Sequence, residues 1–246
     1  YDRRTSSYCY IGTEKPNHDV VIIGWDDSYS KDNFSVDLEG DGAFICQNSW
    51  GDNFGENGFF YISYYDTNIG THNVVYTDIE NTDNYDHIYQ SDLCGWVGQL
   101  GYNKDSIYGA NVFTAEGNET LKAASFYATG KDSQYELYVV RQFEDETSLE
   151  KMIPVASGKL GNAGYYTVDF NQGIEVDAGE RYAVVLYIIT PGSVHPMAIE
   201  YAADEATENV DLDDGESYIS ANGSKWVSVD TVEKSNLCIK AFSDNR

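Results

Sequence analysis

Positive charge is scarce in this chain of 246 residues: 15 lysines and arginines stand against 41 aspartates and glutamates, for a formal net charge of −26. Binding to nucleic acids depends on clustered cations that displace counterions from phosphates, and attraction to anionic lipid surfaces depends on the same cations. No apolar run is long enough to span a bilayer, and the first twenty or so residues lack the layout of a signal peptide. The sequence therefore predicts a protein with no nucleic-acid partner and no membrane insertion.

Cysteine is also rare, with four residues spread along the chain: Cys9, Cys46, Cys94 and Cys238. No two of them form a C-x-x-C pair and no histidine lies at ligand spacing, so a zinc site is not expected, and the count is too low for a disulfide scaffold. Free buried thiols are the default expectation, with pairing left open.

Helical periodicity is nearly absent, because no apolar series at helical spacing continues beyond two turns. Short apolar or alternating runs bounded by Gly, Asn and Asp predict strands instead. The predicted strands are Val20–Trp25, Ala43–Gln47, Phe59–Tyr64, Asn73–Thr77, Ala110–Thr114, Leu121–Ala128, Tyr135–Arg141, Tyr165–Phe170, Arg181–Ile189, Met197–Tyr201, Ser217–Ser220 and Leu237–Phe242. Many short strands joined by polar turns indicate a mainly β protein of antiparallel sandwiches or barrels.

A domain boundary is predicted in the polar, acidic stretch at residues 79–86, which has no strand pattern. We expect a first domain over residues 1–79, a linker over 80–87 and a second domain over 88–246. The second domain, of about 160 residues, is large enough to fold alone, whereas about 80 residues are marginal.

One pair of polar residues in the first domain points to chemistry. His18 lies just before an apolar run, and Asn48 directly follows a later one, in Asn48-Ser49-Trp50-Gly51. A histidine at a strand start and an asparagine at a strand end can meet across an antiparallel sheet, where the Asn carbonyl accepts from one imidazole N–H and fixes the tautomer. Trp50 could then cover that bond and exclude water. A His–Asn pair of this kind is expected for two members of the Cys-His-Asn site of a cysteine peptidase, and a purely structural histidine is the alternative.

Residues 8–66 resemble the C-terminal half of a papain-family cysteine peptidase of the kind found in secreted clostridial-type proteins. The motifs that match, in order, are Tyr10-x-Gly12, Asn17-His18, Gly24-Trp25-Asp26-Asp27, Asn48-Ser49-Trp50-Gly51 and Gly58-Phe59-Phe60. The resemblance implies that His18 and Asn48 are catalytic, His18 as general base and acid and Asn48 as the residue that orients it. It also implies that Trp50 supports them by shielding their hydrogen bond.

Residues 88–246 resemble the lectin-like domain that follows the peptidase in this subfamily. The matching stretches are Gly95-Trp96, Ala110–Ala115, Glu119-Thr120-Leu121, Ser125-Phe126-Tyr127 and Gly215–Tyr218. The two resemblances imply a partial papain-like β-barrel half followed by an antiparallel β-sandwich. They also imply a bacterial protein that is secreted or held at the cell surface.

The family's nucleophile has no counterpart here, since the family places a Cys directly before a Trp at the start of a long helix. Cys9 lies in Tyr8-Cys9-Tyr10, a strand-like run without a helix dipole to lower its pKa, and Cys46 is expected to be a core thiol. We therefore expect the nucleophile to lie outside this chain. The expected partner is the N-terminal half of the peptidase, bearing the catalytic Cys, either as a separate chain of a processed enzyme or as the missing part of a longer one.

The favoured function is the C-terminal portion of a secreted cysteine endopeptidase, inactive alone, with a protein or peptide substrate. One alternative is a non-catalytic surface adhesion or carbohydrate- or protein-binding module that retains a peptidase remnant, and another is a structural protein of the cell wall. Trp96 and Trp226 invite a carbohydrate ligand, although packing is the commoner role of such residues. No cofactor or metal is expected, with calcium left open at the acidic runs Asp37–Asp41 and Asp211–Glu216.

Overall fold

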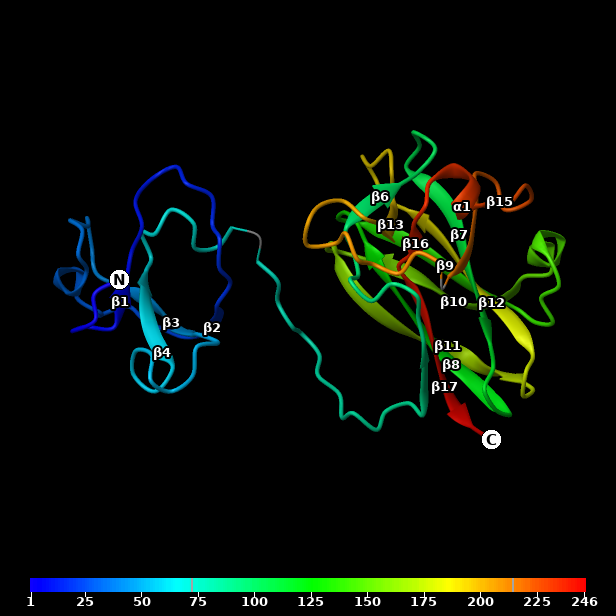
Figure 1. The fold of residues 1–246 in the computed structure, drawn as a ribbon, viewed down its shortest axis with the longest axis horizontal. Helices are drawn as coiled ribbons and strands as arrows, with labels where there is room; N and C mark the ends of the chain where they lie inside the picture. The colour runs from blue at the N-terminus through cyan, green and yellow to red at the C-terminus, as the bar shows by residue number, and fades with distance from the viewer. Residues whose placement is uncertain (72, 214) are drawn as a thin grey trace. The chain divides into compact units, whose positions relative to one another are not determined.

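The structure is a computed structural model that describes residues 1–71, 73–213 and 215–246, and the side chain of residue 230 is not described. The chain forms two compact units, Tyr1–Thr77 and Asp78–Arg246 (Figure 1). Almost all of the regular structure in both units is β-strand, so the predicted mainly β fold is confirmed.

The first unit contains one sheet of four strands in the order β1-β4-β3-β2. Its strands are β1 (Ser7–Tyr8), β2 (Val21–Asp26), β3 (Ala43–Gln47) and β4 (Phe59–Ser63), and a single 3-10 turn, η1 (Lys31–Asn33), follows β2. β1 runs parallel to β4, whereas β2, β3 and β4 are antiparallel neighbours. Each face of the sheet carries a small apolar cluster, one around Phe34 and Leu38 and the other around Cys46, Phe60 and Ile62.

Strand β2 is an edge strand and leaves much of its apolar surface uncovered within this unit. Val21 is 60% exposed, Ile23 52% and Trp25 69%. An irregularity in the register with β3 falls between Ile22 and Gly24, so Ile23 has no partner residue on β3. An edge with unpaired backbone groups and apolar side chains is a surface on which another chain can pair or pack.

The second unit contains a larger, sandwich-like arrangement of antiparallel sheets (Figure 1). The six-stranded sheet has the order β10-β9-β12-β7-β14-β15, formed by β7 (Ser106–Thr114), β9 (Ser133–Val140), β10 (Ile153–Leu160), β12 (Arg181–Ile189), β14 (Glu216–Ser220) and β15 (Val227–Ser228). The four-stranded sheet has the order β11-β8-β17-β5, formed by β5 (His87–Tyr89), β8 (Glu119–Ala128), β11 (Gly164–Val176) and β17 (Ile239–Asn245). A small third sheet joins β16 (Asn236–Leu237), β13 (Met197–Glu200) and β6 (Gly98–Leu100), and the short helices are η2 (Glu146–Glu150) and α1 (Val229–Val232).

The main core of this unit joins the two large sheets. Leu121 and Phe126 of β8 belong to the same buried cluster as Leu137 of β9 and Val184 and Leu186 of β12. In β12, even-numbered residues from Tyr182 to Ile188 face this core because successive strand side chains alternate between faces. The odd-numbered residues of β12 therefore lie on the opposite, outward face of the six-stranded sheet.

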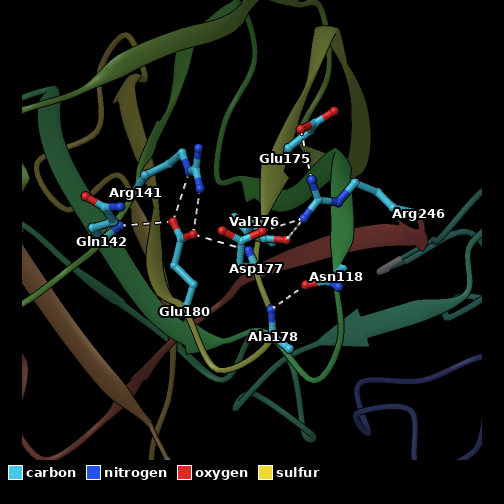
Figure 2. Close-up of polar contacts among 9 residues, drawn as sticks. All are labelled: Asn118, Arg141, Gln142, Glu175, Val176, Asp177, Ala178, Glu180 and Arg246. Atoms are coloured by element: carbon cyan, nitrogen blue, oxygen red, sulfur yellow. Dashed lines mark hydrogen bonds and ion pairs between the residues drawn. The ribbon is translucent and has the colours of Figure 1, made fainter.

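The turn between β11 and β12 is held by charged side chains, as Figure 2 shows. Glu180 accepts from Arg141 Nε at 2.9 Å and from Arg141 Nη2 at 2.6 Å. On the other side of the turn, Arg246 reaches Glu175 at 2.9 Å and Asp177 at 2.6 Å. These ion pairs tie β17 and the segment after β9 to the turn.

The structure corrects two of the predicted strands. Asn73–Thr77 forms no strand, and Val74, Val75 and Tyr76 are each at least three-quarters exposed. A short apolar run alone does not supply a neighbouring strand to pair with. The predicted strand Leu237–Phe242 is divided between β16 and β17, which belong to different sheets. None of the helices in the described part of the chain combines the length and apolarity needed to cross a bilayer.

Candidate functional site

His18 and Asn48 meet at one end of the β2–β3 pair. Antiparallel pairing sets Val21, the first residue of β2, opposite Gln47, the last residue of β3. The residues just before β2 and just after β3 therefore lie at the same end of the sheet. There, His18 Nε2 and Asn48 Oδ1 are 3.1 Å apart.

The chemistry of this pair sets the role of each imidazole nitrogen. An amide oxygen only accepts hydrogen bonds, so the imidazole of His18 donates from Nε2. Nδ1 is then the nitrogen that is free to take a proton from another group. Fixing one nitrogen of a histidine in this way is the usual means of aiming the other.

Asn48 is itself held in place by its backbone neighbours. Its side chain is nearly buried, and Oδ1 also accepts from the backbone N–H of Ser49 at 2.7 Å. The backbone N–H of Asn48 donates to the carbonyl of Gly58 at 3.0 Å. Gly58 has a φ of +89°, a left-handed conformation in which a side chain is strained. Because the Ser49 N–H donates to Oδ1, the side-chain amide of Asn48 is held with its oxygen, and not its nitrogen, toward His18.

Trp50 lies against the histidine, with the two ring centroids 4.9 Å apart and the planes 22° from parallel. Phe54 supports Trp50 from the side, edge to face at 5.0 Å, and in turn packs on Phe60. Trp50 is 62% exposed, so it covers the His18 ring while much of its own surface stays uncovered. The structure thus brings together all three residues that the sequence singled out.

Phe54 is the member of this group that sequence reasoning missed. The signal was present as an aromatic residue four positions after Trp50, within the turn that leads into β4. Its role becomes visible only in three dimensions, because the ring reaches Trp50 across that turn.

All four cysteines lie in the described part of the chain and are free. Cys9 is half-buried and burial raises the pKa of its thiol, while burial raises the pKa of Cys46 to about 12. Cys94 and Cys238 belong to the second unit. Among the described residues, His18 makes its hydrogen-bond and ring contacts with Asn48 and Trp50 and with no cysteine.

The described residues contain no group of three or more His, Cys, Asp or Glu side chains placed to hold a metal ion. In the acidic run Asp211–Glu216, Asp214 lies outside the described residues, Asp211 accepts from the backbone of Asp213 at 3.0 Å, and Glu216 pairs with Arg181. In the run Asp37–Asp41, Asp41 accepts from the backbone N–H of Lys31 at 2.8 Å.

Comparisons with known proteins identify both parts of the chain. Residues 4–79 match the family model of the papain family of cysteine proteases, and residues 88–243 match the model of the lectin-like domain. No curated protein matches the chain.

Two solved structures are similar over the whole chain. One is a clostridial cysteine protease, Cwp84, after propeptide cleavage, with 28% identity and a TM-score of 0.83, of which this chain covers 62%. The other comprises the cysteine protease and lectin-like domains of Cwp84, a surface layer associated protein of Clostridium difficile, with 26% identity and a TM-score of 0.79. This chain is covered completely in both comparisons but spans only 56% of the second structure. The chain therefore belongs to the lectin-like domain family, and in it that domain follows a segment of the papain family of cysteine proteases.

Proposed function

We propose that this chain is the His- and Asn-bearing C-terminal portion of a secreted cysteine endopeptidase, whose cysteine nucleophile lies outside these residues. The observation that carries the proposal is the 3.1 Å contact between His18 Nε2 and Asn48 Oδ1 with Trp50 stacked on the imidazole. A histidine with a purely structural role does not require this arrangement. Here a buried amide fixes one ring nitrogen and an aromatic ring covers the imidazole, while the other nitrogen stays available. The description of Cwp84 as surface layer associated supports a place outside the cell for this chain too.

In the proposed mechanism, His18 acts through Nδ1 because Nε2 is engaged by Asn48. Nδ1 takes the thiol proton, and the thiolate attacks the peptide carbonyl to form a tetrahedral intermediate. The imidazolium then returns the proton to the leaving amine, and a water attacks the thioester with His18 again as base. The neutral Asn48 keeps the ring oriented in both protonation states, and Trp50 limits the access of water to the Asn–His bond.

The uncovered surface of β2 supports the idea that more of the peptidase belongs against this unit. Val21, Ile23 and Trp25 leave exposed apolar side chains along β2, the strand that begins shortly after His18 in the sequence. The two similar structures are longer than this chain by more than a third of their own lengths. We propose that the partner is the N-terminal half of the peptidase, bearing the nucleophile, and that protein or peptide segments are the substrates.

The test is hydrolysis of a fluorogenic peptide by this chain joined to, or co-expressed with, the preceding peptidase half. We expect His18→Ala to lower kcat by at least about a hundredfold, the usual contribution of a general base. His195→Ala, which removes a histidine of the second unit, is the matched control and should leave kcat unchanged. Hydrolysis that survives His18→Ala would refute the assignment. A complete lack of hydrolysis and of labelling by an epoxide thiol probe in the unaltered assembly would favour the non-catalytic binding module.

A further inference from the structure

The loop that leads to His18 has no regular secondary structure. It runs from the end of β1 at Tyr8 to the start of β2 at Val21, and its residues 11–19 are exposed. An exposed segment without strand or helix hydrogen bonds opens easily unless side chains hold it. The contacts that fix this loop therefore help to decide where the imidazole of His18 lies.

Residues 66–68, which follow β4, bond to the beginning of this loop, and we call them the clamp. Asp66 Oδ2 accepts from the backbone N–H of Tyr10 at 2.6 Å, and the backbone N–H of Thr67 donates to the Tyr10 carbonyl at 2.9 Å. The Thr67 hydroxyl lies 3.1 Å from the carbonyl oxygen of Tyr10 and 3.2 Å from that of Gly12, so both share its one proton. The clamp thus engages the loop backbone on both its N–H and its carbonyl groups.

The third residue of the clamp reaches further along the loop. Asn68 Nδ2 donates to the Glu14 carbonyl at 3.1 Å, and the backbone N–H of Glu14 donates to the Tyr10 hydroxyl at 3.0 Å. Among the described residues, the hydrogen bonds to the loop backbone from Tyr10 to Glu14 come from the clamp and from this tyrosine. Only a short stretch then separates Glu14 from His18, and it contains Pro16, whose ring restricts φ.

The clamp is itself fixed to the core of the first unit. Asp66 Oδ1 accepts from the backbone N–H groups of Asn68 and Ile69, each at 2.9 Å. An aspartate that bonds the backbone just after it holds a tight turn. The backbone N–H of Asp66 also donates to the Ser63 carbonyl at the end of β4, at 3.1 Å. Ile69 packs against the buried cluster around Cys46, so the turn cannot move independently of the sheet.

The two oxygens of Asp66 have different partners. Oδ1 holds the turn of the clamp and Oδ2 holds the loop, so one buried side chain joins the loop to the core. An ionised carboxylate presents only acceptors, whereas an amide presents one accepting oxygen and a donor nitrogen. Asp66→Asn therefore loses the hydrogen bonds on one of the two sides.

The position of His18 matters because a general base acts only within hydrogen-bond reach of the proton that it takes. Asn48 and Trp50 hold the ring, but its backbone continues from the loop on one side and into β2 on the other. A displacement of about 1 Å can cost about a hundredfold in rate. A loosened loop would let Nε2 leave Asn48 for part of the time, and Nδ1 would then lose its direction.

We infer that Asp66, Thr67 and Asn68 are positioning residues, which hold the loop before His18 and so keep the imidazole aligned for catalysis. They act through the loop, because the ring of His18 makes its hydrogen bond and its ring contact with Asn48 and Trp50. The inference rests on the proposed peptidase function, since it assigns these residues a part in the same reaction.

The first test is peptide hydrolysis by the assembled peptidase. We expect Asp66→Asn to lower kcat about tenfold and Thr67→Val at least about threefold, with little change in KM. Thr67→Ser keeps the hydroxyl and should retain kcat. Thr5→Val is the matched control, because the Thr5 hydroxyl donates to the Asn33 carbonyl at 2.7 Å, in the same unit but away from the loop. Its kcat should not change.

The second test needs no nucleophile, because nitrogen NMR of the His18 ring in this chain reports its alignment directly. At a pH where the ring is neutral, we expect the Nε2–H tautomer alone in the unaltered chain and in Thr5→Val. Thr67→Val and Asp66→Asn should show a mixture of tautomers and faster exchange of the Nε2 proton. The spectrum of His18→Ala identifies the signal.

A lower kcat and mixed tautomers in Thr67→Val, both restored in Thr67→Ser, would support the inference. It would be overturned by an unchanged ring signal in Thr67→Val and Asp66→Asn, by an equal loss of kcat in Thr5→Val, or by a rise in KM alone. If the unaltered assembly hydrolyses no peptide, the proposed function fails, while the ring signal still decides whether the clamp aligns His18. Thr67→Val is near-isosteric, so it remains informative if Asp66→Asn does not fold.

Discussion

At the scale of single residues, the amide of Asn48 decides which nitrogen of His18 is available for chemistry. In the assembled peptidase, we expect Asn48→Ala to lower kcat by about tenfold to a hundredfold with little change in KM, because the imidazole loses its fixed orientation. Peptide hydrolysis at saturating and limiting substrate measures this split. A rise in KM with unchanged kcat would instead assign Asn48 to substrate binding.

Glu119 is a second residue whose surroundings make a specific prediction. Its fully buried carboxylate accepts from the Tyr89 hydroxyl at 2.7 Å, from Ser243 Oγ at 2.6 Å and from the backbone of Gly117 at 2.8 Å. Burial alone would raise its pKa, but these hydrogen bonds outweigh burial and hold the pKa of Glu119 below its ordinary value of 4.5. The ionised carboxylate is therefore the form that stabilises the folded unit.

We expect Glu119→Gln to lower the free energy of unfolding by about 1–3 kcal/mol at neutral pH, because an amide cannot accept from all of these donors. A lowered folded-state pKa stabilises the protein above pH 4.5 and loses that effect as the pH falls through the folded-state pKa. The difference between Glu119→Gln and the unaltered chain should therefore shrink on acidification. Urea unfolding at several pH values measures it, with the exposed Glu150→Gln as control; a constant difference across pH would contradict the argument.

His18 and Glu119 also show which residues a sequence discloses. His18 and Asn48 could be predicted because the residues around them form short, distinctive motifs at the ends of two strands. The role of Glu119 could not be predicted. Its partners Tyr89 and Ser243 belong to the first and last strands of the second unit in sequence order, and only the strand order β8-β17-β5 brings them together.

At the scale of elements, a strand could be predicted from the sequence when its run of apolar residues was continuous. β12 reads as an unbroken apolar strand, and it was predicted with the bounds that the structure gives it, Arg181–Ile189. β10 was missed because Pro154 and Gly158 interrupt its pattern. Gly158 is needed there, since a Cβ at this position would come within 2.6 Å of the Tyr135 hydroxyl. The prediction for residues 73–77 was wrong in the opposite sense. These residues have the apolar run of a strand, but no neighbouring strand pairs with them.

The edge strand β2 carries a prediction of its own. When this chain is purified without a partner, we expect Ile23→Lys to reduce self-association, since a charge on an edge strand opposes pairing with another chain. The free energy of unfolding should change by less than about 0.5 kcal/mol, because Ile23 is 52% exposed and unpaired. Sedimentation velocity at several concentrations measures the association. Val194→Lys, equally exposed but outside any strand, is the control, and equal behaviour of both variants would contradict the role of β2.

At the scale of the whole molecule, the two units have separate cores of very different size. The apolar clusters of the first unit contain a few buried residues each, whereas the main core of the second unit joins two large sheets. The small unit buries a smaller fraction of its surface and should be less stable. The division into a peptidase segment, a linker and a lectin-like domain stays a prediction, and whether the two parts fold independently is its test.

We expect calorimetry to show two thermal transitions, the lower one from the first unit. A chain that begins at residue 78 should retain the upper transition alone. A single transition that shifts as a whole in that shorter chain would contradict independent folding. The family of each unit was predictable from motifs that are contiguous in the sequence. The surface formed by β9, β10 and β12 was not, because the register of the sheet brings residues from three separate strands together.

The parallel pairing of β1 with β4 has a kinetic consequence for the peptidase segment. Ser7 pairs with Tyr61, so more than half of this unit must be looped before β1 can join the sheet. The antiparallel neighbours β2, β3 and β4 close shorter loops, which cost less chain entropy. Contacts between distant residues form slowly. We therefore expect the docking of β1 to be a late event in the folding of this sheet, so that the time needed to complete the segment depends on how quickly its first residues reach β4.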